Sequence, residues 1–170
     1  MTINHVAVLL VAAIACVWDV RTRRIPNILT FGAAGAALLF NIATGGTEGA
    51  MASAGGWLVG AGALFAAYAL GGMGAGDVKL LGALGAWLGP REALWLALYT
   101  GVAGGMIALL WATVHGYLIQ AVRNLWVLLA YWRLAGVRPM AELTLATGKG
   151  PRLAYATSIL AGTVATVWLR

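Results

Sequence analysis

The chain has few charged residues, and this scarcity limits the solvent in which it can fold. Of its 170 residues only 9% are charged, whereas 62% are hydrophobic, and the mean hydropathy is +0.88. A soluble domain of this length needs many more charged side chains to cover its surface. The composition therefore excludes an ordinary soluble protein and predicts a protein embedded in a lipid bilayer.

Cysteine, histidine and serine are also scarce, and each scarcity excludes a class of site. The single cysteine, Cys16, allows neither an internal disulfide nor a cysteine metal cluster. His5 and His115 are far apart in sequence and lie outside any HExxH pattern, which excludes a zinc protease site of that type. Neither Ser53 nor Ser158 lies in a GxSxG setting. If the chain is a protease, its carboxylates are the only catalysts available, and we expect no metal and no other cofactor.

Long apolar runs predict an all-α polytopic membrane protein with about six transmembrane helices in a single domain, residues 1–170. The predicted spans are 3–18, 28–44, 50–70, 78–88, 93–114 and 153–169. The first run is predicted to be a retained helix, because no basic residue precedes it and no small-residue cleavage site follows it. Residues 115–151 carry several charges and are predicted to lie mostly outside the hydrocarbon, with an interfacial amphipathic helix at about 115–135. A membrane span that tolerates Arg123 is the alternative for this stretch.

The basic residues predict the orientation of the chain. Lysine and arginine outnumber acidic residues by 11 to 5, and in a membrane protein this excess marks topology and contacts with anionic lipid rather than with nucleic acid. If the loop after the first span is cytoplasmic, Arg91 and Arg170 lie outside. The basic residues on the inside are then Arg21, Arg23, Arg24, Lys79, Arg123, Arg133, Arg138, Lys149 and Arg152. This positive-inside bias predicts a multi-pass membrane protein with Asp19 and Asp77 on its cytoplasmic side.

Two aspartates lie at the inner ends of predicted spans. Asp19 closes the first span, and Asp77 opens the fourth, behind the glycines of GGMGAGDVKLL at 71–81. Antiparallel helices bring both carboxylates to a similar depth. Eleven residues at ~1.5 Å each give the fourth span only ~17 Å, too little to cross ~30 Å of hydrocarbon. Either its outer end stops short or Asp77 begins below the inner membrane surface, where a carboxylate is a functional candidate.

The chemistry of such a pair suits peptide hydrolysis. Two carboxylates held close share one proton, so that one can take a proton from water while the other polarises the scissile carbonyl. Nearby glycines would let a substrate backbone approach. The ends of the two helices predict that the shared proton lies on Asp19, because helix dipoles favour negative charge at the start of a helix and disfavour it at the end. A structural alternative stays open: Asp77 N-caps the fourth helix, and Asp19 pairs with Arg21 or Arg23 at the membrane surface.

Two motifs resemble those of one family. GAGD at 74–77, followed by Val78 and Lys79, resembles the GxGD motif of the type IV prepilin peptidases, which are aspartic membrane proteases. Asp19 followed by RIPN at 24–27 resembles the first catalytic segment of that family. The resemblance implies that Asp19 and Asp77 are the catalytic pair. It also implies that the substrate is a prepilin or pseudopilin, whose short basic leader is cleaved at the cytoplasmic face of the bacterial inner membrane. The supporting residues it implies are Gly74, Gly76, Lys79, Pro26 and Asn27.

The chain differs from larger members of that family in two respects. Larger members carry an N-terminal cytoplasmic region with paired cysteines and add N-methylation, so this chain is similar to the short peptidase-only form associated with Flp (tight-adherence) pili. In place of a Pro-Tyr step common in that family the chain has Ala154 and Tyr155, and no role is assigned to Tyr155. The alternative function is a non-enzymatic small transporter or pilus-assembly subunit that uses Asp77 for ion or proton coupling. The sequence specifies neither the pilin, nor the cleavage-site preference, nor the oligomeric state.

Three further polar residues receive structural predictions. Lys79 is predicted to anchor its helix at the membrane interface, in preference to fixing the loop or touching substrate. Asn27 is predicted to cap the second span. Asn41, in the middle of an apolar run, is predicted to make a hydrogen bond between helices.

Overall fold

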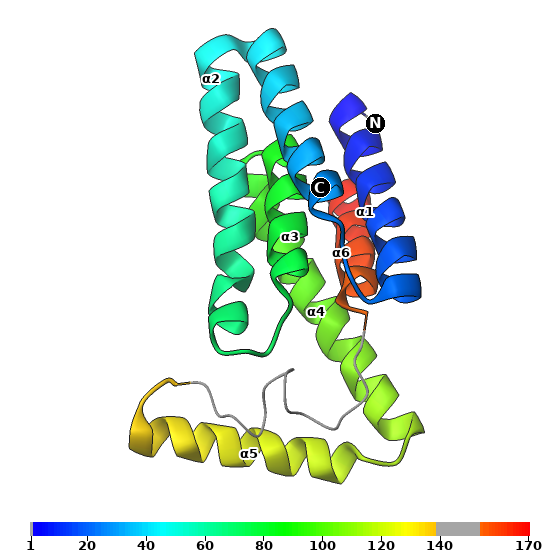
Figure 1. Ribbon diagram of the computed structural model, residues 1–170, viewed down its shortest axis with the longest axis vertical. Coiled ribbons are helices and arrows are strands. Elements are labelled where there is room, and N and C mark those ends of the chain that lie inside the picture. The colour runs from blue at the N-terminus through cyan, green and yellow to red at the C-terminus, as the bar shows by residue number, and fades with distance from the viewer. Residues whose placement is uncertain (1, 139–153) are drawn as a thin grey trace.

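A computed structural model describes residues 2–138 and 154–170, and all the regular structure in these ranges is helical (Figure 1). This confirms the all-α prediction for the described part of the chain. The elements are α1 (Ile3–Thr22), α2 (Asn27–Ala69), α3 (Ala75–Leu88), α4 (Pro90–Val114), α5 (Leu118–Ala135) and α6 (Tyr155–Leu169).

Helix α2 is a hairpin rather than a single rod. Gly46 interrupts it with φ 58° and ψ −136°, a conformation that a residue with a Cβ avoids, and the chain doubles back there (Figure 1). The two arms correspond to the predicted spans 28–44 and 50–70, so the predicted break at the glycines between them is confirmed.

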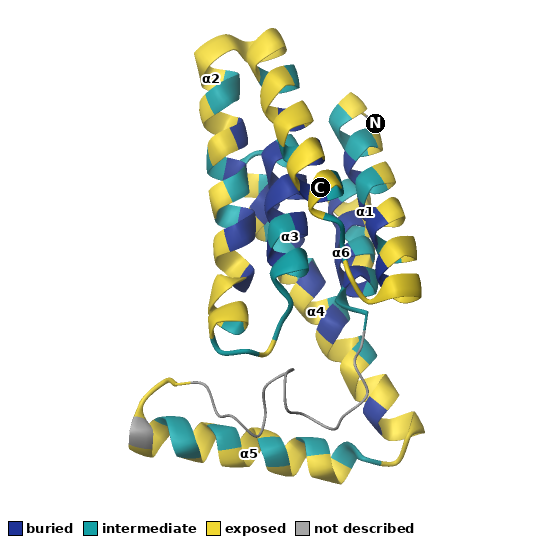
Figure 2. Cartoon of the chain, viewed as in Figure 1, coloured by how far each residue is buried: buried dark blue, intermediate teal, exposed yellow. Residues whose placement is uncertain are grey.

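Helix α3 lies at the centre of the bundle, where it packs against α1, α2, α4 and α6 (Figures 1 and 2). Every residue from Leu80 to Ala86 is buried. Small residues permit this close packing, because Gly56 and Gly60 of α2 bring the backbones of α2 and α3 into direct contact near Gly85 and Leu81. The central helix is thus held by backbone proximity as much as by side-chain packing.

Two asparagines satisfy the carbonyl groups at the C-terminal end of α3. The Asn41 side chain donates a hydrogen bond of 3.2 Å to the carbonyl of Ala86, and the Asn4 side chain donates one of 3.0 Å to the carbonyl of Trp87. The last carbonyls of a helix have no partner within the helix and are costly to bury unbonded. The hydrogen bond between helices predicted for Asn41 is therefore confirmed, and it explains how a helix of 14 residues can end inside the bundle.

Three helices of the described residues are long and apolar enough to cross a membrane: α1, α2 and α4. Helix α6 is apolar but has only 15 residues, and the predicted start of the last span, residue 153, lies outside the described residues. The count of six spans therefore stays a prediction. Lys149 and Arg152, assigned to the cytoplasmic side, also lie outside the described residues.

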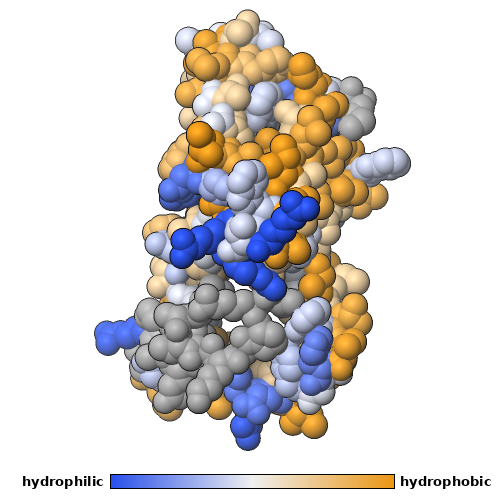
Figure 3. All heavy atoms as spheres, turned by 45° about the vertical axis from the view of Figure 1, so that its right-hand side comes forward, coloured by the Kyte–Doolittle hydropathy of each residue, from blue (hydrophilic) through white to orange (hydrophobic). Residues whose placement is uncertain are grey.

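Helix α5 runs across the lower end of the bundle instead of along it (Figure 1). It is absent from the candidate spans among the described residues. Its exposed apolar side chains include Ile119, Val122, Leu125, Trp126 and Leu129. Figure 3 shows a largely apolar upper body and hydrophilic side chains gathered below it. This arrangement favours the interfacial interpretation of the stretch over a membrane span.

Several predicted helix boundaries were wrong. Helix α4 begins at Pro90, three residues before the predicted start of its span. The other two large differences lie at the two aspartates. Helix α1 continues four residues beyond Trp18 to Thr22, and it ends where Arg23 adopts a left-handed conformation with φ 55°. Helix α3 begins at Ala75, three residues before the predicted start. In both cases a polar or glycine residue was taken as the end of the helix, although the backbone hydrogen bonds continue through it. Asp19 and Asp77 therefore lie inside the terminal turns of their helices.

Candidate active site

Asp19 faces the interior of the bundle. It continues the buried stripe of α1 formed by Val8, Ala12 and Ala15, whose spacing places all four residues on one helix face. Only 8% of its surface is exposed. Because the two nearest members of the stripe are alanines, neighbouring helices can approach the carboxylate closely.

Asp19 also caps a distant helix. Its Oδ2 accepts a hydrogen bond of 3.3 Å from the backbone N–H of Ala156, the second residue of α6. The N-cap residue of α6, Ala154, offers no side-chain hydrogen bond to the helix. Asp19 supplies an acceptor for one of the N–H groups that a helix start leaves unbonded. Sequence reasoning missed this contact, because no local pattern links residues 137 positions apart.

Asp77 lies in the first turn of α3. Steric contacts explain why glycine occupies positions 74 and 76 beside it. A Cβ on Gly74 would stand 3.1 Å from Asp77 Oδ2, and a Cβ on Gly76 would stand 3.2 Å from Cβ of Ile25. Gly74 thus leaves space for the carboxylate, and Gly76 lets the segment after α1 lie against α3. The N-cap of α3 is Gly74, with no side-chain cap bond, so the alternative in which Asp77 is the N-cap was wrong.

The fold brings the two aspartates together. Helices α1 and α3 pack against each other, and the carboxylates of Asp19 and Asp77 lie close enough for their charges to interact. Among the described residues no three His, Cys, Asp or Glu side chains gather into a group able to hold a metal. The geometry therefore offers a pair of carboxylates beside a glycine-rich turn, inside a helical bundle.

The remaining predicted site residues lie at the start of α2 and near the start of α3. Pro26 is the N-cap of α2 and Asn27 is its first residue, with no side-chain cap bond, so the capping prediction for Asn27 was wrong. Instead, Asn27 Oδ1 accepts a hydrogen bond of 3.0 Å from Lys79 Nζ, which also lies 5.1 Å from the centre of the Phe31 ring. Lys79 thus ties the start of α3 to the start of α2, which is the loop-fixing role that the sequence reading ranked below a membrane anchor.

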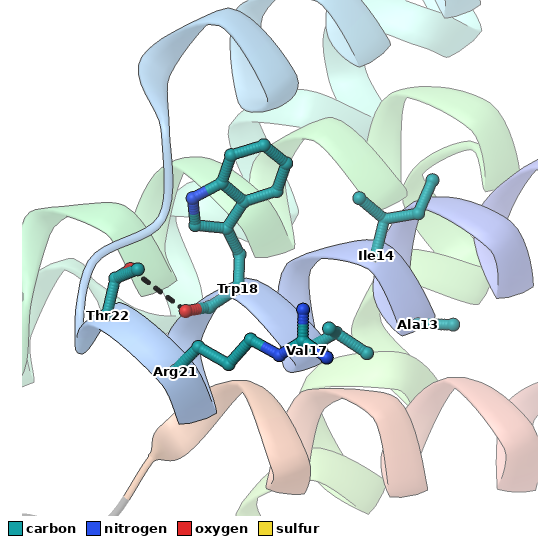
Figure 4. A pocket seen from close by; sticks show the side chains of 6 residues that line it. All are labelled: Ala13, Ile14, Val17, Trp18, Arg21 and Thr22. Atoms are coloured by element: carbon teal, nitrogen blue, oxygen red, sulfur yellow. Dashed lines mark hydrogen bonds between the residues drawn. The ribbon is translucent and has the colours of Figure 1, made fainter.

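Two apolar hollows lie on other faces of these helices. One, of about 570 Å³, opens on the outer face of α1 (Figure 4) and is lined by Ala13, Ile14, Val17, Trp18, Arg21 and Thr22. The other, of about 530 Å³, lies between the α2 arms and α3, where Trp57, Phe65 and Val78 are among its lining residues. The described lining of neither hollow includes Asp19 or Asp77, so neither is assigned to the carboxylate pair.

The capping contact makes a prediction about stability. Asp19→Ala removes the acceptor for the Ala156 N–H and is expected to cost about 1 kcal/mol, or about 2–4 °C in the unfolding temperature. Asp19→Asn keeps an oxygen acceptor and is expected to unfold within about 1 °C of the unmodified protein on the same scale. Thermal unfolding in detergent, followed by circular dichroism, measures both. Equal unfolding temperatures for the Ala and Asn variants would contradict the capping role.

Comparisons with known proteins identify the family of the chain. A model of the type IV leader peptidase family matches residues 6–109, a range that contains both aspartates. A prepilin leader peptidase/N-methyltransferase of Dickeya chrysanthemi is 33% identical over 115 residues, which cover 60% of this chain and 38% of that protein. No solved structure matches. Because the family model covers more than half of the sequence, the chain belongs to the type IV leader peptidase family.

Proposed function

We propose that this protein is an aspartic endopeptidase that removes the leader from a prepilin or pseudopilin. The observation that supports this most is that Asp19 of α1 and Asp77 of α3 lie close enough for their charges to interact, where the two helices pack together. Ionisable side chains inside a membrane protein are costly and are functional candidates. Of this pair Asp19 is buried and Asp77 is partly buried, and the two come from different helices at one end of the bundle. Family membership supplies the reaction class, hydrolysis of a leader peptide bond.

The chemistry follows from the pair. One carboxylate accepts a proton from a water molecule as the water oxygen attacks the scissile carbonyl carbon, while the other, protonated, carboxyl donates a hydrogen bond to the carbonyl oxygen. Collapse of the tetrahedral intermediate breaks the C–N bond, and the leaving amine takes a proton from the pair. Asp19 Oδ2 is held by the Ala156 N–H, which leaves the other oxygen of Asp19 available for the proton shared with Asp77.

The charges support a cytoplasmic site in a bacterial inner membrane. We propose six spans, made by α1, the two arms of α2, α3, α4 and α6, with α5 in the interface. Arg21, Arg23 and Arg24 lie at the end of α1 that bears Asp19. Arg170 lies at the opposite end, 4.0 Å from Glu92. The basic end then faces the cytoplasm and anionic lipid, without a role in nucleic-acid binding.

A processing assay tests the proposal. The protein is co-expressed with a prepilin of the Flp class and, separately, with a type IV pseudopilin, each bearing its uncleaved leader. Mass spectrometry is expected to show loss of the leader by cleavage of one peptide bond, with the Flp prepilin processed faster. Full-length prepilin in both cases, despite normal membrane insertion of the protein, would contradict the proposal and favour the transporter or assembly-subunit alternative.

A further inference from the structure

The start of α6 contacts Asp19 and lies within electrostatic range of Asp77. Tyr155, its first residue, directly precedes Ala156, whose N–H binds Asp19. The phenol of Tyr155 lies close enough to Asp77 for the two groups to interact electrostatically. One turn of a helix distant in sequence therefore contacts one carboxylate through its backbone and approaches the other with a side chain.

The ring of Tyr155 occupies a recess that a glycine leaves in α4. A Cβ built on Gly104 would stand 3.0 Å from Cε2 of the tyrosine and 3.2 Å from its hydroxyl oxygen. Any larger residue at position 104 would thus displace the ring. Gly105, the next residue of α4, has nothing within 4 Å of an added Cβ. The close fit is specific to the glycine that faces the tyrosine.

The hydroxyl of Tyr155 is an available hydrogen-bond donor. The hydroxyl makes no hydrogen bond to any residue within 2–138 or 154–170, and the side chain is only half-buried. A tyrosine that served only to fill space at Gly104 would not need its hydroxyl. A positioned donor beside a reacting carbonyl is the arrangement that stabilises the negative charge of a tetrahedral intermediate.

We propose that Tyr155 is a third catalytic residue of this site, whose hydroxyl donates a hydrogen bond to the scissile carbonyl oxygen next to Asp77. The inference rests on the proposed peptidase function and adds a residue to it. No covalent bond to Tyr155 forms, and its proton stays on the phenol throughout. The hydrogen bond strengthens as charge develops on the carbonyl oxygen, so it acts on the chemical step more than on substrate binding.

The first test removes the hydroxyl and keeps the ring. The full-length protein is reconstituted with a Flp-class prepilin in vesicles of phosphatidylethanolamine and phosphatidylglycerol, and kcat and KM are measured separately. Tyr155→Phe is expected to lower kcat by about 100-fold, with KM within about twofold, because a donor used only in the transition state lowers kcat and kcat/KM together. Tyr68→Phe, which removes the hydroxyl of an exposed tyrosine in α2, is the matched control and is expected to leave both constants unchanged.

The second test displaces the Tyr155 ring by adding a Cβ to Gly104, against which the ring packs. Gly104→Ala is expected to lower kcat by about tenfold, since displacement of a donor weakens it without removing it, whereas Gly105→Ala is expected to have no effect. In a Tyr155→Phe background Gly104→Ala is expected to add little, because both changes act on one hydroxyl. A normal kcat for Tyr155→Phe, or a loss confined to KM, would overturn the inference. Asp77→Asn is measured in parallel: if it is inactive while Tyr155→Phe is normal, the inference fails and the proposed peptidase stands, and if Asp77→Asn is active the peptidase proposal itself fails.

Discussion

Replacement of Asp77 by Asn is expected to lower the rate of prepilin cleavage by about 10⁴-fold or more, the loss typical of removing one member of a catalytic group. Asn has nearly the shape of Asp and still accepts a hydrogen bond, but it neither takes up a proton nor carries charge. The first turn of α3 should therefore keep its geometry, because the Asn oxygen can still accept the backbone hydrogen bond from Gly74. The loss is expected in kcat.

The measurement is the rate of leader removal under single-turnover conditions, in vesicles with a reconstituted prepilin. Glu48→Gln is the matched control, since it neutralises an exposed acidic residue in α2, near the turn of the hairpin. The control is expected to cleave at the rate of the unmodified protein. An Asp77→Asn protein that cleaves as fast as the Glu48→Gln control would exclude a catalytic carboxylate at position 77.

Substitution of the glycines between α2 and α3 is expected to have the largest effect on stability. Gly56 and Gly85 face each other so closely that a Cβ on either one would overlap the carbonyl oxygen of the other. A Cβ on Gly60 would stand 2.9 Å from the carbonyl carbon of Leu81. Backbone cannot rotate away as a side chain can, so the two helices must separate. Overpacking of this kind typically costs about 1–3 kcal/mol, and we expect Gly56→Ala and Gly60→Ala to reach the upper end.

The same substitutions are expected to reduce cleavage, because α3 carries Asp77 and any shift of α3 moves it relative to Asp19. Gly62→Ala is the control on the same arm of α2, since an added Cβ there has nothing within 4 Å. Unfolding by heat in detergent and the single-turnover rate are measured on all three variants. If Gly56→Ala is as stable and as active as Gly62→Ala, the direct backbone contact between α2 and α3 is wrong.

The sequence predicted the helices well because the bilayer imposes a simple pattern on it. In a bilayer the backbone hydrogen bonds of a span must be made within the helix, so each apolar run predicts a helix. The glycines near residue 46 and the arginines after α1 mark where such runs end. Asp19 was predicted only to close the first span. Its inward direction follows from its helical spacing from Val8, Ala12 and Ala15, which the prediction did not use. Helix ends were less certain, since a glycine or an aspartate is compatible with both a terminal turn and a loop.

The contribution of α6 to the site could not be predicted. The bond from Ala156 to Asp19 uses a backbone N–H, which any residue type provides, and the recess for Tyr155 depends on a glycine of α4. This contact also changes the argument about the shared proton. The prediction that it lies on Asp19 considered only the end of α1, whereas the start of α6 meets the same carboxylate, so that two opposed helix dipoles act on it.

The central claim is that Asp19 and Asp77 act as one unit, and a double-substitution cycle tests it most directly. Single-turnover cleavage of the reconstituted prepilin is measured for Asp19→Asn, Asp77→Asn and the double variant. Residues that share one step show strongly non-additive losses, so the double variant is expected to be no slower than either single variant, within about tenfold. A single variant that cleaves at the normal rate would contradict the claim that the two aspartates act as one unit. Losses that multiply in the double variant would contradict it as well.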